Sequence, residues 1–557
     1  MPQLDFTSYL RPHEVEAALK GFAEEYPQLT ALSSIGKSHE GREIWCLALT
    51  NKETGPDTEK PALWLDANIH ATEVTGCMGA LHVIQRVLTA YGKEERITQL
   101  LDTRALYVVP CLNPDGMEQA LTSPVYVRSG TRRYPYEDER DGLYPADING
   151  DGLILQMRVV DPDGGWKVSE KDPRLMRRRG PDDHGGTYYR VYTEGRIRNY
   201  DGFTVKIAPP AQGLDFNRNF PYIWAPEGLQ RGAGPYPGSE PETRATIAFL
   251  SSHLNVSGAI SYHTYSGAIL RPYSDKPDDK MAIEDLWTYK EIGKRGKELT
   301  GYPDVSVYHG FRYHPREVMN GAFDDWAYDQ LGIFAFTVEL WDMVGEAGIK
   351  ERDFIEWMRD HPEEDDLKLL QWNDEQLDGK GFVPWQPFEH PELGPVEIGG
   401  WIERRTFGNP PEKLLLKTIE PNTEFVIAHA LMSPRLELRQ VSATSLGEGV
   451  YHVRAVVANS GYLPTYGSKR AQEIRAVRPI EVRLTLPEGA ELVTGEAFQE
   501  IGQLEGRANK RALFGGNYPT DNLRKLEWTV RAPAGGELKI EAVAQRAGTA
   551  RATITLP

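Results

Sequence analysis

Cysteine is scarce in this chain, which has three in 557 residues. Cys46, Cys77 and Cys111 make an odd number and lack the spacing of a disulfide framework, which excludes a small scaffold held together by disulfides. Each lies in an apolar stretch, so we expect three buried free thiols and a reducing compartment.

Long apolar runs are also missing. No stretch of about 18 apolar residues occurs, and Met1 to Asp5 show neither the basic nor the apolar region of a signal peptide. We therefore expect no transmembrane helix and a cytoplasmic location, with secretion left open if a leader had been removed. The Gly-x-Ser-x-Gly turn is absent too, which disfavours serine hydrolase chemistry.

Positive charge is outnumbered in this sequence. Lys and Arg total 63 against 81 Asp and Glu, which gives a formal net charge of −18 at pH 7. Nucleic acid and anionic membrane surfaces would repel such a chain, so neither is an expected partner. The content of 40% hydrophobic and 26% charged residues is typical of a globular protein.

The chain is too long for one ordinary hydrophobic core and predicts a large domain followed by a smaller one. Apolar periodicity predicts helices over 11–26, 76–91 and 411–432 and buried strands over 44–49 and 105–110. This alternation favours an α/β domain over 1–432, with a mixed sheet and helices on both faces. Beyond Pro434 the apolar period becomes two, as in Tyr451, Val453 and Ala455, which predicts a β-sandwich over 433–557.

Two predicted strands end in a histidine. The apolar run Leu63–Ile69 leads to His70, with Glu73 three residues later, and the run Val256–Tyr262 leads to His263. Side chains at the carboxyl ends of strands in an α/β sheet point toward the ligand-binding edge. Catalytic zinc takes three protein ligands and leaves one position open, so these side chains are candidate ligands.

A carboxylate interrupts a third apolar run. Glu339 lies within Ile333–Trp341, where burial would raise its pKa toward the range of a general base. The alternative is a glutamate on the solvent face of an edge strand.

These residues, taken in order, resemble the zinc carboxypeptidases of the carboxypeptidase A type. The motifs are His70-x-x-Glu73, Asn113-Pro114-Asp115-Gly116, Asp215-Phe216-Asn217-Arg218-Asn219, Ser261-Tyr262-His263 and Phe336-Thr337-Val338-Glu339-Leu340, and the resemblance covers roughly residues 5 to 345. It implies a mixed eight-stranded-type sheet and one zinc ion held by His70, Glu73 and His263, with Glu339 as the general base. It also makes Asn217 and Arg218 the clamp for a substrate carboxylate, and Arg128 the group that stabilises the oxyanion, with Arg132 as the fallback.

The sequence departs from the family in three places. Thr72 stands where the family often has arginine, which puts the usual contacts to longer substrates in doubt. The tyrosine that closes over the substrate in the family corresponds to Glu317 here, so Tyr313, or Tyr308, is a candidate only if the loop carries an insertion. Tyr265 is a further candidate for substrate binding. The long separation between Glu73 and His263 indicates inserted residues at about 133–212, and an extension follows at about 346–432, helical or loop up to Trp385.

Two finer expectations concern single side chains. The resemblance places Asp324 at the base of the side-chain pocket, where an acidic residue goes with basic C-terminal residues. Asp147, Asn149 and Asp151 match the first half of a calcium loop, although its twelfth position is Arg158. The alternative is a turn rich in Asp and Asn without a ligand.

The function that follows from the resemblance is hydrolysis of the C-terminal peptide bond of peptides with a free C-terminus. The alternative is an amidase or N-acyl-amino-acid hydrolase that uses the same metal centre on small or cell-wall-derived substrates. A peptide-binding module without catalysis also remains open.

Overall fold

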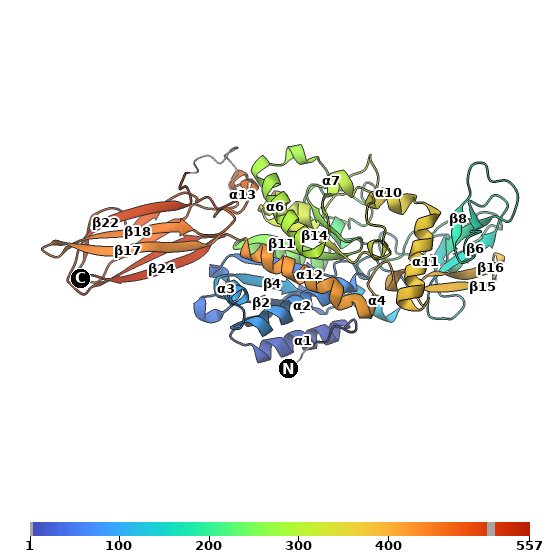
Figure 1. Ribbon diagram of the computed structural model, residues 1–557, viewed down its shortest axis with the longest axis horizontal. Helices are drawn as coiled ribbons and strands as arrows, with labels where there is room; N and C mark the ends of the chain where they lie inside the picture. The colour runs from blue at the N-terminus through green and yellow to red at the C-terminus, as the bar shows by residue number, and fades with distance from the viewer. Residues whose placement is uncertain (1–3, 509–518) are drawn as a thin grey trace.

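The central part of the molecule is a mixed sheet of eight strands, seen in the middle of Figure 1. The computed structural model describes residues 4–508 and 519–557. The strands follow the order β1 (Thr30–Lys37), β2 (Glu43–Leu49), β4 (Ala105–Val109), β3 (Ala62–Ala67), β11 (Val256–Thr264), β14 (Phe334–Leu340), β12 (Ala268–Arg271) and β13 (Asp304–Ser306). The three strands predicted to carry the metal-binding and catalytic residues, β3, β11 and β14, are neighbours and run parallel.

Helices cover both faces of this sheet, as predicted. On one face α12 (Glu412–Leu431) packs between α2 (Val74–Ala90) and α6 (Ile283–Thr300), and α2 approaches β11 through Gly76 and Gly79, where a Cβ would lie about 3.1 Å from Tyr262. On the other face Phe249 of α5 (Pro241–Ser252) packs on the rings of Trp64 and Tyr107. The remaining helices of this region are α1 (Pro12–Glu25), α3 (Glu95–Thr103), α4 (Pro114–Thr122), α7 (Val307–Gly310) and α8 (Phe323–Leu331). The α/β fold class is confirmed.

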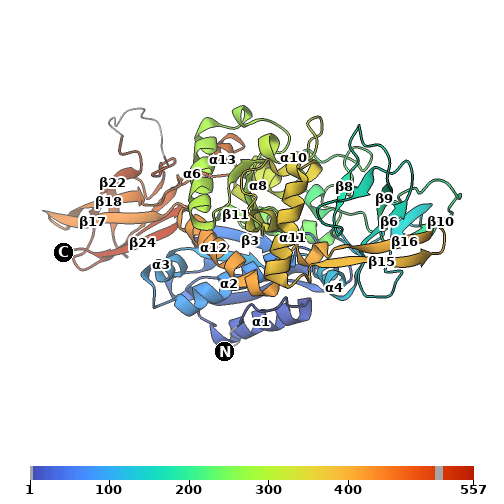
Figure 2. The same ribbon diagram turned by 45° about the vertical axis from the view of Figure 1, so that its right-hand side comes forward.

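The inserted residues form a second sheet together with part of the extension. Its order is β15 (Phe382–His390), β16 (Gly394–Trp401), β6 (Gln156–Val160), β9 (Tyr189–Thr193), β7 (Trp166–Val168) and β8 (Met176–Arg178). Figure 2 shows it at the end of the molecule opposite the C-terminus. The extension was predicted as helix or loop up to Trp385. It follows α9 (Met343–Glu346) and contains α10 (Phe354–Arg359) and α11 (Glu363–Leu377), but the strand β15 was missed. The insertion also holds the pair β5 (Gly142–Pro145) and β10 (Gly195–Arg198).

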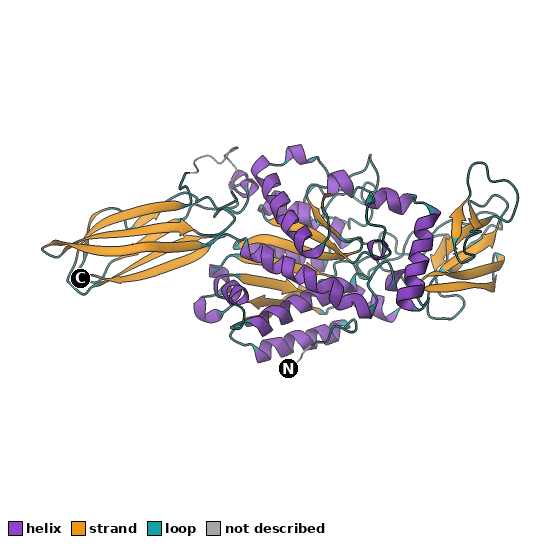
Figure 3. Ribbon diagram, viewed as in Figure 1, coloured by secondary structure: helices purple, strands orange, loops and turns teal. Residues whose placement is uncertain are grey.

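The C-terminal part is a β-sandwich, as predicted. One sheet contains β17 (Leu436–Gly447), β18 (Val450–Asn459), β22 (Leu523–Arg531) and β20 (Glu491–Thr494), and the other β21 (Phe498–Glu500), β19 (Glu481–Thr485), β23 (Glu537–Ala544) and β24 (Gly548–Thr555). Inward side chains of both sheets, such as Val453, Trp528 and Ile540, share one core. Figure 3 shows this all-strand unit beside the helix-rich centre.

The sandwich contacts the central domain through polar groups. Arg546 is buried and donates hydrogen bonds to the carbonyl oxygens of Leu331 and Gly332, which directly precede β14. At the start of the short helix α13 (Lys469–Glu473), the backbone N–H groups of Lys469 and Arg470 donate hydrogen bonds to the carboxylate of Asp285 in α6.

Two expectations from the sequence concern free cysteines and the lack of a transmembrane helix. Cys46, Cys77 and Cys111 are buried and form no disulfide. Among the residues that the structure describes, no helix is both long enough and apolar enough to cross a membrane.

Candidate metal centre

His70, Glu73 and His263 converge at the carboxyl ends of β3 and β11. His70 lies just beyond β3, Glu73 is the residue before α2 begins, and His263 is the penultimate residue of β11. All three are buried, with at most 5% of each residue exposed. Among the described residues, these side chains form the one group of three or more His, Cys, Asp or Glu whose ligand atoms lie within 4.8 Å of one another.

The donor set fits zinc. The Nδ1 atoms of His70 and His263 lie 3.0 Å apart, and each lies within 3.0 Å of a carboxylate oxygen of Glu73. A four-coordinate zinc ion with ligands at about 2.0–2.1 Å sets neighbouring donor atoms about 3.3 Å apart. Two imidazole nitrogens and one carboxylate in this arrangement match the ligand type, number and spacing that a catalytic zinc ion takes.

The protonation states favour metal binding. Burial lowers the pKa of His263, which keeps its ring in the neutral form that binds metals. Burial opposes ionisation of Glu73, but the charges of His70 and His263 outweigh burial and hold the pKa of Glu73 below its usual value. Near neutral pH the ring of His263 is therefore neutral and the carboxylate of Glu73 is ionised.

Each histidine is oriented by a second partner. Asp215 accepts a hydrogen bond from His70 Nε2 at 3.0 Å. On the other side, His263 Nε2 lies 3.3 Å from Ser261 Oγ, which donates to Asp66 Oδ1 at 2.6 Å. Such carboxylate and hydroxyl partners fix the ring tautomer and leave the Nδ1 atoms free for the metal. Asp215 belongs to a motif quoted from the sequence, but its role was not predicted.

Glu339 lies beside the ligands and pairs in register with His263 across β11 and β14. Burial raises the pKa of its carboxyl well above the ordinary value, and the negative charge of Glu73 raises it further, while Arg128 opposes the change. The alternative of an edge strand is wrong, because β14 lies between β11 and β12; Glu339 is half-buried and the other residues of the strand are buried.

Arg128 is the arginine at the metal ligands. Its Nη1 donates to Glu73 Oε1 and its Nε to Asp215 Oδ2, both at 3.1 Å. Arg132, the fallback from the sequence, instead forms an ion pair with Glu240 at 2.7 Å and carries no contact to the ligands.

Asn217 and Arg218 lie in the turn η3 (Phe216–Arg218) that follows Asp215. Asn217 Oδ1 accepts a hydrogen bond from the backbone N–H of Phe323 at 2.8 Å, so the amide nitrogen of the Asn217 side chain is not used in this contact. Arg218 is 7% exposed and donates to the carbonyl oxygen of Asn217 at 2.7 Å. Among the described residues, no carboxylate forms an ion pair with Arg218. This buried guanidinium is therefore available to bind an anionic group.

Asp324 lies in the first turn of α8 and is 3% exposed. Burial raises the pKa of its carboxyl to about 6, and Arg218 opposes the increase. The negative charge of Asp324 also contributes to the raised pKa of Glu339. Asp324 also has no ion pair within the described ranges 4–508 and 519–557.

The charges of the site act on the pKa values of three tyrosines. Tyr313 is 52% exposed, and burial of its hydroxyl raises its pKa, with Arg218 and Arg128 as the largest charges that act on it. Burial also raises the pKa of Tyr265 to about 12, helped by Glu403 and Glu339. Tyr126, not predicted from the sequence, responds to the charge of Arg128. Of the three, Tyr265 directly follows β11, which carries His263.

The predicted calcium loop is not supported. Asp147 accepts the backbone N–H groups of Gly150 and Gly152, and Asp151 accepts that of Leu153. The side-chain amide of Asn149 donates a hydrogen bond to the carboxylate of Asp151 within the same turn. The side-chain oxygens of the loop therefore accept hydrogen bonds from the loop's own backbone, which agrees with the alternative of an Asp- and Asn-rich turn.

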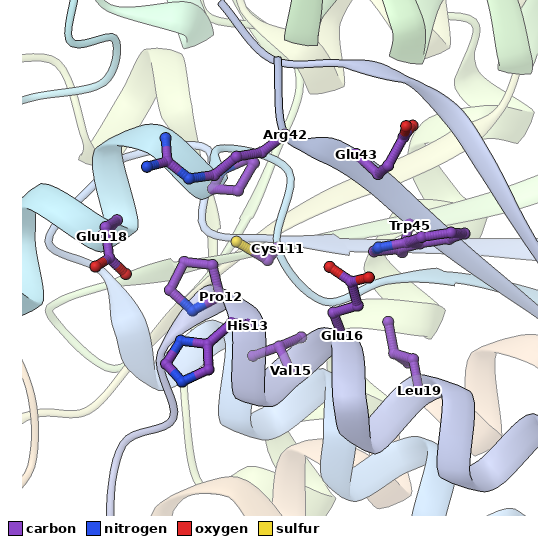
Figure 4. A pocket seen from close by; sticks show the side chains of 11 residues that line it. Pro12, His13, Val15, Glu16, Leu19, Arg42, Glu43, Trp45, Cys111 and Glu118 are labelled. Carbon is purple, nitrogen blue, oxygen red and sulfur yellow. The ribbon is translucent and has the colours of Figure 1, made fainter. Parts of the chain in front are cut away.

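A pocket of about 210 Å³ lies away from this centre, between α1, β2 and the start of α4 (Figure 4). Its lining includes His13, Glu16, Trp45 and Cys111, and none of the predicted site residues. The pocket is therefore separate from the metal centre.

Comparison with known proteins agrees with this geometry. A family model described as zinc carboxypeptidase matches residues 15–354, and a model described only as a domain of unknown function matches 435–555. Carboxypeptidase A2 of Rattus norvegicus is 26% identical over 380 residues, 64% of this chain and 72% of that protein. Carboxypeptidase B of Homo sapiens is 25% identical over 358 residues, 60% of this chain and 64% of that protein.

Among solved structures, the crystal structure of thrombin activatable fibrinolysis inhibitor shares 19% identity with a TM-score of 0.44, covering 76% of this chain and 74% of that chain. The family model covers more than half of the chain and includes every predicted ligand. The chain belongs to the zinc carboxypeptidase family of metallohydrolases.

Proposed function

We propose that this enzyme removes single residues from the free C-terminus of peptides, with a preference for Lys and Arg. The observation that carries the proposal is Arg218. It is a buried guanidinium three residues after Asp215, the partner of His70, and no carboxylate of the described chain lies within ion-pair distance of it. The free carboxylate of a peptide end supplies that partner in the bidentate geometry that arginine prefers.

The chemistry that zinc supplies in such a site is Lewis-acid polarisation of a carbonyl group and a lowered pKa for water. Glu339, with its raised pKa, accepts the proton of the attacking water and returns it to the leaving amine. Arg128 lies at the ligands, where negative charge develops on the carbonyl oxygen. Arg218 and the amide of Asn217 hold the terminal carboxylate, so only the last peptide bond is in position.

Asp324 supports the preference for basic residues. An unpaired, buried carboxylate near Arg218 and Glu339 is neutralised when a lysine or arginine side chain enters the same site. Carboxypeptidase B appears among the relatives beside carboxypeptidase A, so resemblance alone does not separate basic from apolar specificity.

The test is product mass analysis of matched peptides that end in Lys, Arg, Phe, Leu or Glu, each with a free or an amidated C-terminus. We expect loss of one residue at a time from free ends only, fastest for Lys and Arg. Trimming of amidated peptides would contradict the role of Arg218. Hydrolysis of acylated amino acids without any peptide trimming would favour the amidase alternative.

A further inference from the structure

Glu73 has two roles that compete for its side chain. It is one of the three candidate zinc ligands, and it is also the N-cap residue of α2. The side chain of an N-cap residue normally accepts the N–H of the second or third helical residue, because the helix itself provides no acceptor there. Within the described residues 4–508, the Glu73 carboxylate caps no N–H group of α2 and instead contacts His70 and His263. The first turn of α2 therefore needs another acceptor.

Asn409 supplies this acceptor from a distant part of the chain. Its Oδ1 accepts the backbone N–H of Thr75, the second residue of α2, at 3.1 Å, and the Thr75 hydroxyl at 2.8 Å. The N–H of the second helical residue is one that a local cap would bind, and asparagine is among the best capping residues. Asn409 is only 3% exposed, so the contact is shielded from water.

The amide nitrogen of Asn409 binds the chain on the other side of Glu73. It donates to the carbonyl oxygen of Thr72 at 2.8 Å and to that of Arg404 at 3.1 Å. One side chain thus contacts the residue before Glu73 and the residue two positions after it, Thr75. Because the backbone is held on both sides of the ligand, the direction in which the carboxylate leaves the backbone is restricted too.

Asn409 is itself held in place from two directions. The hydroxyl of Tyr9 donates to the carbonyl oxygen of Pro410, the next residue, at 2.5 Å. Arg404, whose carbonyl oxygen binds Asn409, donates to the carbonyl oxygen of Ser123 at 2.8 Å. A group that positions a metal ligand is effective when its own conformation is locked in this way.

The other half of the metal-binding loop is supported from within the part of the chain that matches the family model. Asn68 donates to the carbonyl oxygen of His70 at 3.0 Å, and it lies inside the matched residues 15–354. Asn409 lies beyond them, shortly before α12. The extension therefore completes the support of the metal centre on the side of Glu73.

We propose that Asn409 is a positioning residue of the zinc centre. It caps α2 in place of Glu73 and thereby leaves the Glu73 carboxylate to the metal. Without Asn409, the unpartnered N–H of Thr75 competes with zinc for that carboxylate, because a negatively charged side chain is stabilised at the N-terminus of a helix. The inference concerns how the metal is held and does not depend on which peptides are cleaved.

The experiment measures the zinc affinity of the full-length protein by metal-buffer competition after its zinc has been removed. Asn409→Ala should bind zinc about 10-fold more weakly than the wild type, at the lower end of the effects seen for outer partners of metal ligands. Asn409→Asp keeps an oxygen for the Thr75 N–H and should retain most of the wild-type affinity. Wild-type affinity in Asn409→Ala, or a tenfold loss in Asn409→Asp, would overturn the inference.

Asn459→Ala is the matched control for a general loss of stability. Asn459 is 2% exposed, and like Asn409 its side chain accepts two hydrogen bonds and donates two, but it does so in the sandwich. This variant should unfold at a lower urea concentration and keep the wild-type zinc affinity. A loss of zinc affinity equal to that of Asn409→Ala would show that Asn409 acts only through stability.

A second comparison tests whether Asn409 acts through Glu73. In a Glu73→Ala background, Asn409→Ala should no longer change the zinc affinity, because the carboxylate that the cap releases for the metal is gone. The same loss in both backgrounds would contradict the proposed role of the cap.

Discussion

Replacing Arg218 with methionine should remove the preference for a free C-terminus. Methionine keeps much of the length and apolar character of the side chain but has neither its charge nor its donors. Arg218 is 7% exposed, and one donor is used by the carbonyl oxygen of Asn217, so other N–H groups are left for a carboxylate. Loss of one partner from a buried, hydrogen-bonded charge pair costs about 2–5 kcal/mol, or about 30- to 5000-fold in kcat/KM.

The assay compares kcat/KM on one peptide with a free and with an amidated end, for the wild-type enzyme and for Arg218→Met. The variant should lose most of its rate on the free peptide, change little on the amidated one and retain zinc, because Arg218 touches none of the ligands. Arg231→Met, which removes an exposed arginine, is the control and should behave as the wild type. A variant that still discriminates between the two ends by the wild-type ratio would refute the assignment of Arg218.

Three further predictions concern the metal, the pH dependence and the sandwich. Asp215→Ala should weaken zinc binding about 10- to 100-fold in metal-buffer competition, because Asp215 orients His70; unchanged affinity would argue against that role. Burial raises the pKa of Asp324 to about 6, so its charge is present above that pH and is lost below it. The ratio of kcat/KM on peptides ending in Lys to that on peptides ending in Leu should therefore decrease as the pH is lowered from about 7 to about 5. A ratio that does not change with pH would contradict the pairing of Asp324 with a basic side chain. Arg546→Ala should lower the free energy of unfolding by about 2 kcal/mol in urea titrations, and no loss would mean that its hydrogen bonds to Leu331 and Gly332 contribute little.

The metal ligands and the general base could be predicted because each lies at the end of, or within, a conspicuous apolar run. His70, His263 and Glu339 are polar residues on or directly after neighbouring interior strands of one sheet. Burial makes such residues costly without a function, so local sequence is sufficient to single them out. The helices α2 and α12 were predicted to within about two residues for the same reason, since their buried faces follow a clear helical period.

The second sheet could not be predicted because its pairing is not local. Glu397 of β16 pairs with Arg158 of β6, far away in sequence, and only the folded chain brings the two strands together. Pro384 and Pro387 also argue against a strand in the sequence, yet β15 is an edge strand that tolerates them.

Whether this centre cleaves peptides through Glu339 is tested by the zinc content and turnover of Glu339→Gln, measured side by side with the wild-type enzyme. Glu339 is not a metal ligand in this arrangement, so the variant should bind one zinc per chain and lose at least about 100-fold in turnover of a peptide with a free C-terminus. Zinc bound with turnover unchanged would show that this centre does not cleave peptides through Glu339.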